Sequence, residues 1–218
     1  MKNTPESSDA RQPIDRFLAW ESTQPRRHEY AAGVVHAMTG GTVRHSLLTL
    51  NLVRLLHGPA RARHCVVVAS DVPLLAAADR VYYPDVMLAC GRTPHDERII
   101  EQPVLVAEVT SPSTRATDQR EKVEAYCRLD ALRLYLIIDQ RRRHVIAYAR
   151  ESVEQPWQRA EYSDVEEQIT VPSFGTTFTV GALYDGVELP PLMVRDELAA
   201  WAEDDEAARE LEDLWRLQ

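Results

Sequence analysis

Apolar residues between Tyr82 and Asp139 fall into three short runs separated by polar segments. The first run follows Pro84-Asp85, the second covers 104–109 and the third covers 134–138. Short apolar runs bounded by polar residues indicate buried strands, and the polar segment between the second and third runs has the character of a helix. Two strands, a crossover helix and a third strand are therefore predicted, which is an α/β arrangement.

The same reasoning gives the remaining elements in chain order: a short amphipathic helix over 14–21, a hairpin over 29–38 around Gly33, a largely buried helix from Val43 to about His57 ended by Gly58-Pro59, and strands at 65–72, at 144–150 and within 153–178. Together these elements predict a central mixed sheet of about five strands. The long helix is expected on one face, with the crossover helix on the other face or beside it.

The two ends of the chain differ in composition from its centre. Residues 1–13 are rich in Ser, Asp, Asn and Pro and are expected to be flexible. From Pro190-Pro191 onward the chain is strongly acidic with apolar residues at helical spacing, which predicts an acidic helical tail over 190–218. A single folded domain is expected over 14–189. Because its negative charge would repel a phosphate-bearing ligand, the tail is predicted to pack against the domain or to form a homodimer rather than to bind such a ligand.

The overall charge limits the partners of the protein. A net charge of -9 and a pI near 5.3 exclude a general basic surface for nucleic acid, so any such binding needs a local concentration of positive charge. The chain has no run of about 18 apolar residues and no apolar segment near Met1, so we expect a soluble, cytoplasmic protein without a membrane partner. The three cysteines, Cys65, Cys90 and Cys127, lack metal-ligand spacing and are predicted to be thiols in a reducing compartment.

Two carboxylates in the central segment indicate chemistry. Asp85 follows a proline, where an ordinary turn or cap residue would also be expected. Glu108 interrupts an apolar strand, and a lone carboxylate in a core is costly unless it is paired or metal-bound. Two carboxylates on neighbouring strands, without a His/Cys cluster, favour Mg²⁺ or Mn²⁺ over zinc. With Lys122 on the following helix, they predict a divalent-metal site.

These residues are part of a wider pattern that resembles a known family. The similarity covers about Phe17 to Val187 in several separated motifs. It resembles the Uma-two family of putative restriction endonucleases, within the PD-(D/E)xK nuclease superfamily. The residues that carry the similarity are Glu29, Gly33, Met38, His45, Pro84-Asp85, the segment 108–114, Asp118, Lys122, Tyr126 and the segment 135–139. The resemblance implies a restriction-endonuclease-like fold for the domain.

The resemblance also implies roles for individual residues. Asp85 and Glu108 would bind the metal, with the carbonyl oxygen of Val109 as an additional ligand. The superfamily places a lysine two residues after the glutamate, where this chain has Thr110. The resemblance implies that the catalytic lysine has moved to the helix, as Lys122.

The polar residues of the crossover helix also suit purely structural roles. Asp118 and Lys122 are four positions apart, which suits an ordinary surface ion pair, and from the residues alone that role is favoured for Lys122. Asp118 and Glu121 have capping-box spacing, so Asp118 is either a cap or a supporting residue of the site. Tyr126 either packs in the core or orients Lys122.

Two residues earlier in the chain, Glu29 and His45, also have two possible roles each. Glu29 either approaches the metal site or forms a salt bridge with Arg26 or Arg27. His45 lies near the start of the long helix and is either a hydrogen-bonded core histidine or a participant in catalysis.

We therefore expect a magnesium- or manganese-dependent endonuclease that hydrolyses phosphodiester bonds of a nucleic acid, with DNA as the expected substrate. The alternative is a catalytically silent, nuclease-like fold that binds nucleic acid or protein. The acidic composition keeps that alternative open, and metal-dependent cleavage of DNA would distinguish the two.

Overall fold

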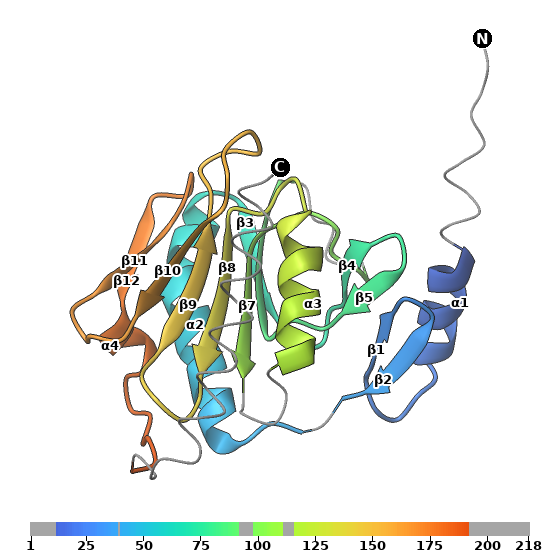
Figure 1. Ribbon diagram of the computed structural model, residues 1–218, viewed down its shortest axis with the longest axis horizontal. Helices are drawn as coiled ribbons and strands as arrows, with labels where there is room; N and C mark the ends of the chain where they lie inside the picture. The colour runs from blue at the N-terminus through green and yellow to red at the C-terminus, as the bar shows by residue number, and fades with distance from the viewer. Residues whose placement is uncertain (1–11, 39, 92–97, 111–115, 192–218) are drawn as a thin grey trace.

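A computed structural model describes residues 12–38, 40–91, 98–110 and 116–191 (Figure 1). The prediction of an acidic helical tail falls almost wholly outside these residues, as does that of a flexible N-terminus. The described helices are α1 (Gln12–Glu21), α2 (Val43–Ala62), α3 (Ala116–Cys127) and α4 (Val180–Leu183). None of the helices in the described part of the chain is long and apolar enough to cross a membrane.

The strands occur in three sheets. In chain order they are β1 (His28–Ala31), β2 (Val34–Ala37), β3 (Cys65–Ala69), β4 (Leu74–Ala77), β5 (Arg80–Tyr82), β6 (Val86–Cys90), β7 (Pro103–Thr110), β8 (Leu134–Asp139), β9 (Val145–Ala149), β10 (Gln158–Tyr162), β11 (Gln168–Val171) and β12 (Thr176–Thr179).

The central sheet has six strands in the order β10-β9-β8-β7-β6-β3. β7 and β8 are parallel, and the other neighbours are antiparallel, so the sheet is mixed as predicted. A parallel pair needs a crossover connection, and α3 lies in the connection between β7 and β8. The α/β prediction is confirmed, with one more strand in the central sheet than the approximate number expected.

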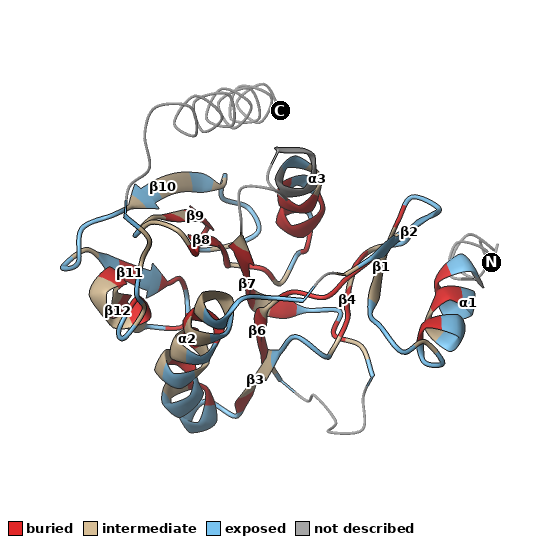
Figure 2. Ribbon diagram, turned by 90° about the horizontal axis from the view of Figure 1, so that it is seen from below, coloured by how far each residue is buried: buried red, intermediate tan, exposed pale blue. Residues whose placement is uncertain are grey.

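Successive residues of β7 point to opposite faces of this sheet. Ala107 and Val109 belong to the hydrophobic cluster under α2, whereas Val106 belongs to the cluster that includes Tyr126 of α3. The two helices cover opposite faces in both views, and their buried sides face the sheet (Figures 1 and 2). Glu108, which alternates with Ala107 and Val109, therefore lies on the α3 side.

A second sheet, β2-β1-β5-β4, lies beside the central one. The predicted hairpin is confirmed as β1–β2, whose turn contains Ala32 and Gly33, both with positive φ. Ile14 and Phe17 of α1 pack with Val81 of β5. β5 leads within two residues to Pro84-Asp85 and the start of β6, so this small sheet joins the central sheet next to the predicted site.

α2 differs from the prediction at its end and in its burial. It continues to Ala62 with Pro59 inside it, so the expected stop at Gly58-Pro59 is wrong. Leu52, Leu56 and Ala60 are buried in succession on one side, and this packing on the sheet outweighs the loss of one helical hydrogen bond at proline. The opposite side is exposed, including Leu50 at 63%.

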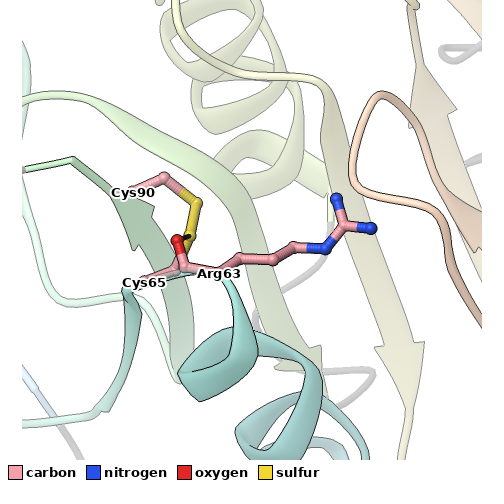
Figure 3. Close-up of a disulfide and its surroundings, with 3 residues drawn as sticks. All are labelled: Arg63, Cys65 and Cys90. Carbon is pink, nitrogen blue, oxygen red and sulfur yellow. Dashed lines mark hydrogen bonds between the residues drawn. A yellow bond between two sulfur atoms is a disulfide. The ribbon is translucent and has the colours of Figure 1, made fainter.

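The cysteine prediction is wrong for two of the three residues. Cys65 of β3 and Cys90 of β6 are paired directly across the two antiparallel strands and form a disulfide (Figure 3). The Cα atoms lie 4.2 Å apart because strand pairing brings the two residues opposite each other. Their separation of 25 residues carried no sign of this register. Cys127 is a free, buried thiol whose pKa is raised by burial.

Candidate metal and catalytic site

Glu108 is held by two groups from α3. The Tyr126 hydroxyl donates to Oε1 of Glu108 at 2.8 Å, and Lys122 Nζ lies 3.3 Å from the same oxygen. The Glu108 side chain is only 11% exposed. These contacts supply the hydrogen bond and the opposite charge that a carboxylate needs inside a core.

Lys122 and Tyr126 reach Glu108 together because positions four apart lie on one face of a helix. The Lys122 side chain is 9% exposed, and its ammonium also contacts Glu29 Oε1 of β1 at 2.9 Å. Nζ lies 5.3 Å from the ring centroid of Tyr82, so an aromatic face forms a further part of its surroundings. Lys122 is therefore a buried cation between two carboxylates, not a surface lysine.

Asp85 lies between β5 and β6 and contacts two other elements. Its Oδ2 accepts the Val109 backbone N–H of β7 at 2.7 Å. Its Oδ1 lies 3.1 Å from Nε2 of His45 on α2. The first contact places Asp85 beside the residue that follows Glu108, so the two carboxylates belong to one site.

The start of α2 fixes the position of His45. Thr42 caps the helix and accepts the His45 backbone N–H at 3.2 Å. Gly41 leaves space for the imidazole, because a Cβ there would lie 2.9 Å from His45 Nδ1. The hydrogen bond with Asp85 raises the pKa of His45 above its ordinary value, against the opposing effect of burial. His45 is thus directed at a predicted metal ligand.

Electrostatics distinguishes Glu108 from an ordinary glutamate. Burial raises the pKa of Glu108 to about 8; Lys122 opposes this rise, whereas the charges of Asp85 and Glu29 add to it. Several carboxylates thus share a single ammonium in a site that disfavours their combined negative charge. Additional positive charge in this site would favour the ionised form of Glu108.

The donor set fits a hard divalent cation that keeps much of its water. In the described ranges there is no group of three or more His, Cys, Asp or Glu side chains arranged to hold a metal. Mg²⁺ is commonly bound by only one or two carboxylates, and Asp85 and Glu108 supply two. Val109 directly follows Glu108 in β7, and the role of its carbonyl oxygen as a ligand stays a prediction.

The structure places most of the predicted residues in this site. Asp85, Glu108 and Lys122 come together with Glu29, His45 and Tyr126. Glu29 contacts Lys122 and the Tyr83 backbone N–H, and Tyr126 binds Glu108 rather than Lys122. Asp118 lies in α3, but its side chain falls outside the described residues. The catalytic roles of these residues stay predictions.

Sequence reasoning missed the residues around Lys122. Tyr82 lies under the ammonium, and its hydroxyl donates to Glu121 Oε1 at 3.1 Å. Arg80 Nε lies 3.2 Å from the same oxygen. One signal was available: Lys122 and Lys2 are the only lysines among 25 basic residues, so an ammonium at this position is unusual for the chain.

A family model described as "Putative restriction endonuclease" and named Uma2 matches residues 14–181. The chain belongs to the Uma2 family. The match covers all three sheets and every residue discussed at this site. The resemblance seen in the sequence motifs is thereby confirmed.

Curated relatives and a solved structure extend this comparison. An uncharacterized protein of Synechocystis sp., slr1290, is 29% identical over 175 residues, covering 79% of this chain and 91% of the relative. A second uncharacterized protein of that organism, sll1609, is 31% identical over 128 residues, covering 57% and 72%. A crystal structure of a putative nuclease belonging to DUF820 from Anabaena variabilis superposes with a TM-score of 0.65 at 17% identity, covering 80% of this chain and 98% of that one. This likeness shows that the Uma2 chain has a restriction-endonuclease-like fold.

Proposed function

We propose that this protein is a metal-dependent endonuclease that hydrolyses phosphodiester bonds of DNA. The observation that carries the proposal is the contact of Lys122 with Glu108, next to the contact of Asp85 with the Val109 amide. Two carboxylates and one ammonium, all largely removed from water, form a site suited to a cation and a phosphate. Membership of the Uma2 family supports nuclease chemistry.

In this proposal Asp85 and Glu108 hold Mg²⁺ or Mn²⁺, with the Val109 carbonyl oxygen as a further ligand. A bound cation of this kind polarises a phosphoryl oxygen and lowers the pKa of a coordinated water. Lys122 stabilises the negative charge that develops on the phosphate.

Three neighbours keep these groups in place. Tyr126 holds the Glu108 carboxylate by its hydroxyl, and His45 holds Asp85 by its imidazole. Glu29 anchors the Lys122 ammonium. Removal of partners of this kind typically lowers metal affinity or activity by about 10–100-fold.

Cleavage of plasmid DNA tests the proposal. We expect the wild-type protein to nick or linearise plasmid with Mg²⁺ or Mn²⁺ and not with EDTA. Glu108→Gln alters a proposed ligand itself, so it should lower the single-turnover rate by more than the roughly 10–100-fold that follows loss of a ligand's hydrogen-bonding partner. Glu124→Gln, which removes a half-exposed carboxylate of α3, is the matched control and should cleave normally.

Cleavage that is independent of added cation, or unchanged in Glu108→Gln, would contradict the proposal. Binding of DNA without any cleavage would instead identify a catalytically silent nuclease-like fold.

Thermal unfolding provides a readout independent of activity. A ligand that binds only the folded state stabilises it by about 2.7 kcal/mol at a hundred times its Kd. Mn²⁺ should therefore raise the Tm of the wild-type protein and of Glu124→Gln. Glu108→Ala should lose most of that rise, and an equal rise in this variant would place the cation elsewhere.

A further inference from the structure

Four arginines lie together at the start of α2 and in the turn that joins β8 to β9. Arg141, Arg142 and Arg143 are consecutive in the turn, and Arg44 is in the first helical turn of α2. Arg44 Nη1 lies 3.4 Å from the carbonyl oxygen of Gln140, which precedes the three arginines. We call these four residues the arginine surface.

Hydrogen bonds fix the arginine surface to the body of the domain. The Thr42 hydroxyl, which caps α2, donates to the Gln140 side chain. The Gln140 backbone N–H donates to the carbonyl oxygen of Thr110 at 3.3 Å. The turn is therefore tied both to the start of α2 and to the end of β7.

These ties place the arginine surface next to the candidate site. Thr110 is two residues after Glu108 and pairs with Asp139, the residue before Gln140. Two residues of a strand span about 7 Å, and neighbouring strands lie about 5 Å apart. Arg44 directly precedes His45, which contacts Asp85. The ends of β7 and β8 and the start of α2 lie at the same lower edge in Figure 1.

A buried carboxylate shapes the turn without covering it. Asp139 accepts the Arg141 backbone N–H at 2.8 Å and lies 3.1 Å from Arg142 Nε. Its side chain is 2% exposed, whereas Arg143 is exposed. Asp139 therefore orders the backbone of the turn and orients one guanidinium. The next basic residue, His144, lies 2.7 Å from Glu161 and adds little net charge.

The charge of the arginine surface contrasts with that of the whole chain. The protein carries a net charge of -9, so its overall field repels polyanions. A nucleic-acid ligand must be held by local cations, and guanidinium groups bind phosphate oxygens in bidentate geometry. The first turn of α2 contains no acidic residue, so the positive end of the helix adds to the same potential.

We infer that Arg44, Arg141, Arg142 and Arg143 bind the phosphates of a DNA strand beside the bond to be cleaved. The nature of the ligand rests on the proposed function, and the positive surface itself rests on the contacts above. The arginine surface supplies the affinity for phosphate that the carboxylate-rich site lacks. The divalent cation and the DNA strand are thereby assigned to adjacent but different residues.

Equilibrium binding in EDTA tests the inference without cleavage. A fluorescein-labelled DNA duplex is titrated with protein across a salt series and followed by anisotropy. The test variant is R44Q/R141Q/R143Q, which retains Arg142 because it pairs with buried Asp139. The control, R54Q/R61Q/R128Q, removes the same charge from exposed positions farther along α2 and at the end of α3.

Each phosphate contact contributes about 0.9 to the slope of log K against log salt concentration. The test variant should therefore show a slope shallower by about 2.7, and at low salt an affinity weaker by about tenfold or more. The control should keep the wild-type slope. If the triple variant folds poorly, Arg143→Gln alone serves as the test, because Arg143 is exposed. This single variant should make the slope shallower by about 0.9.

Equal losses in the test and control variants would overturn the inference, as would wild-type protein that binds no DNA at low salt. The outcome is separable from that of the proposed function. Binding that depends on the arginine surface, without cleavage under any cation, supports the inference and contradicts the endonuclease. Normal cleavage with an unchanged KM in the test variant supports the endonuclease and overturns the inference.

Discussion

Lys122 Nζ lies 2.9 Å from Oε1 of Glu29, a residue 93 positions earlier in the chain. The same ammonium lies 3.3 Å from Glu108. One cation therefore joins β1 of the small sheet to β7 of the central sheet. Because Glu29 Oε1 also accepts the Tyr83 backbone N–H, its position is fixed by the segment that leads to Asp85. The small sheet thus takes part in ordering the site.

Glu29→Ala should lower the cleavage rate by about 10–100-fold, because Lys122 loses one of the carboxylates that contact it in the described part of the chain. Glu29→Gln retains an oxygen that can accept from both Lys122 and the Tyr83 amide, so it should keep most of the activity. Single-turnover rates at saturating Mn²⁺ measure the difference. Equal rates for Glu29→Ala and the wild-type protein, both folded at the assay temperature, would show that Glu29 has no influence on the site.

The raised pKa of Glu108 predicts how stability changes with pH in metal-free buffer. The carboxyl titrates near its ordinary value of 4.5 in the unfolded chain and at about 8 in the folded protein. Between these pH values the folded state binds the extra proton, so the free energy of unfolding falls as pH rises from about 4.5 to about 8. Glu108→Gln cannot ionise and should lack this contribution.

Thermal unfolding in EDTA at several pH values measures the effect. The Tm of Glu108→Gln minus that of the wild-type protein should increase as pH rises through this range. Each kcal/mol by which the free energy of unfolding of the wild-type protein falls should add at least about 2 °C to this difference. Glu124→Gln, at a half-exposed position, should parallel the wild-type protein. A constant difference between Glu108→Gln and wild type across the range would mean that the ionised form is fully compensated by its neighbours.

The strands and the crossover helix could be predicted because run length and apolar spacing are local properties. The partners of Glu108 could not be predicted from spacing in the same way. Whether Tyr126 reaches Glu108 or packs elsewhere depends on the rotation of α3 about its axis, which packing on the sheet decides. The motifs predicted residues that the structure brings together, but they did not predict the contacts among them.

The end of α2 and the disulfide were missed for related reasons. A proline normally ends a helix, but the buried side formed by Leu56 and Ala60 continues past Pro59. The pairing of Cys65 with Cys90 follows from the register of β3 on β6, and nothing in the spacing of the cysteines reports that register. Long-range packing decided both features, and local patterns do not contain it.

Reduction of the Cys65–Cys90 disulfide should lower stability. The bond closes a loop of about 25 residues. In the chain-entropy description, loss of such a cross-link lowers the free energy of unfolding by about 3 kcal/mol, because the unfolded chain gains entropy. Dithiothreitol should therefore lower the Tm of the wild-type protein. The double variant C65S/C90S should show a similarly lowered Tm that no longer responds to the reductant, whereas Cys127→Ser should still respond. A wild-type Tm unaffected by complete reduction would contradict the prediction.

Lys122 is predicted to supply the catalytic positive charge from α3, in place of a lysine at position 110 of β7. Lys122→Ala should lower the single-turnover cleavage rate by about a hundredfold or more, the loss typical of one electrostatic donor. Because the ammonium is buried between Glu29 and Glu108, the variant should also lose about 3–5 kcal/mol of stability in metal-free buffer. Rates must therefore be compared well below the Tm of the variant.

A second change separates loss of charge from loss of structure. Glu108 and Thr110 of β7 are two residues apart, so their side chains share a face of the sheet. Adding Thr110→Lys to Lys122→Ala returns an ammonium to that face and should recover part of the rate. Full recovery is not expected, since an error of about 1 Å in placement can itself cost about a hundredfold. Lys122→Met, of similar length without charge, should remain as slow as Lys122→Ala. A wild-type rate in either single variant would show that the lysine only binds the two carboxylates.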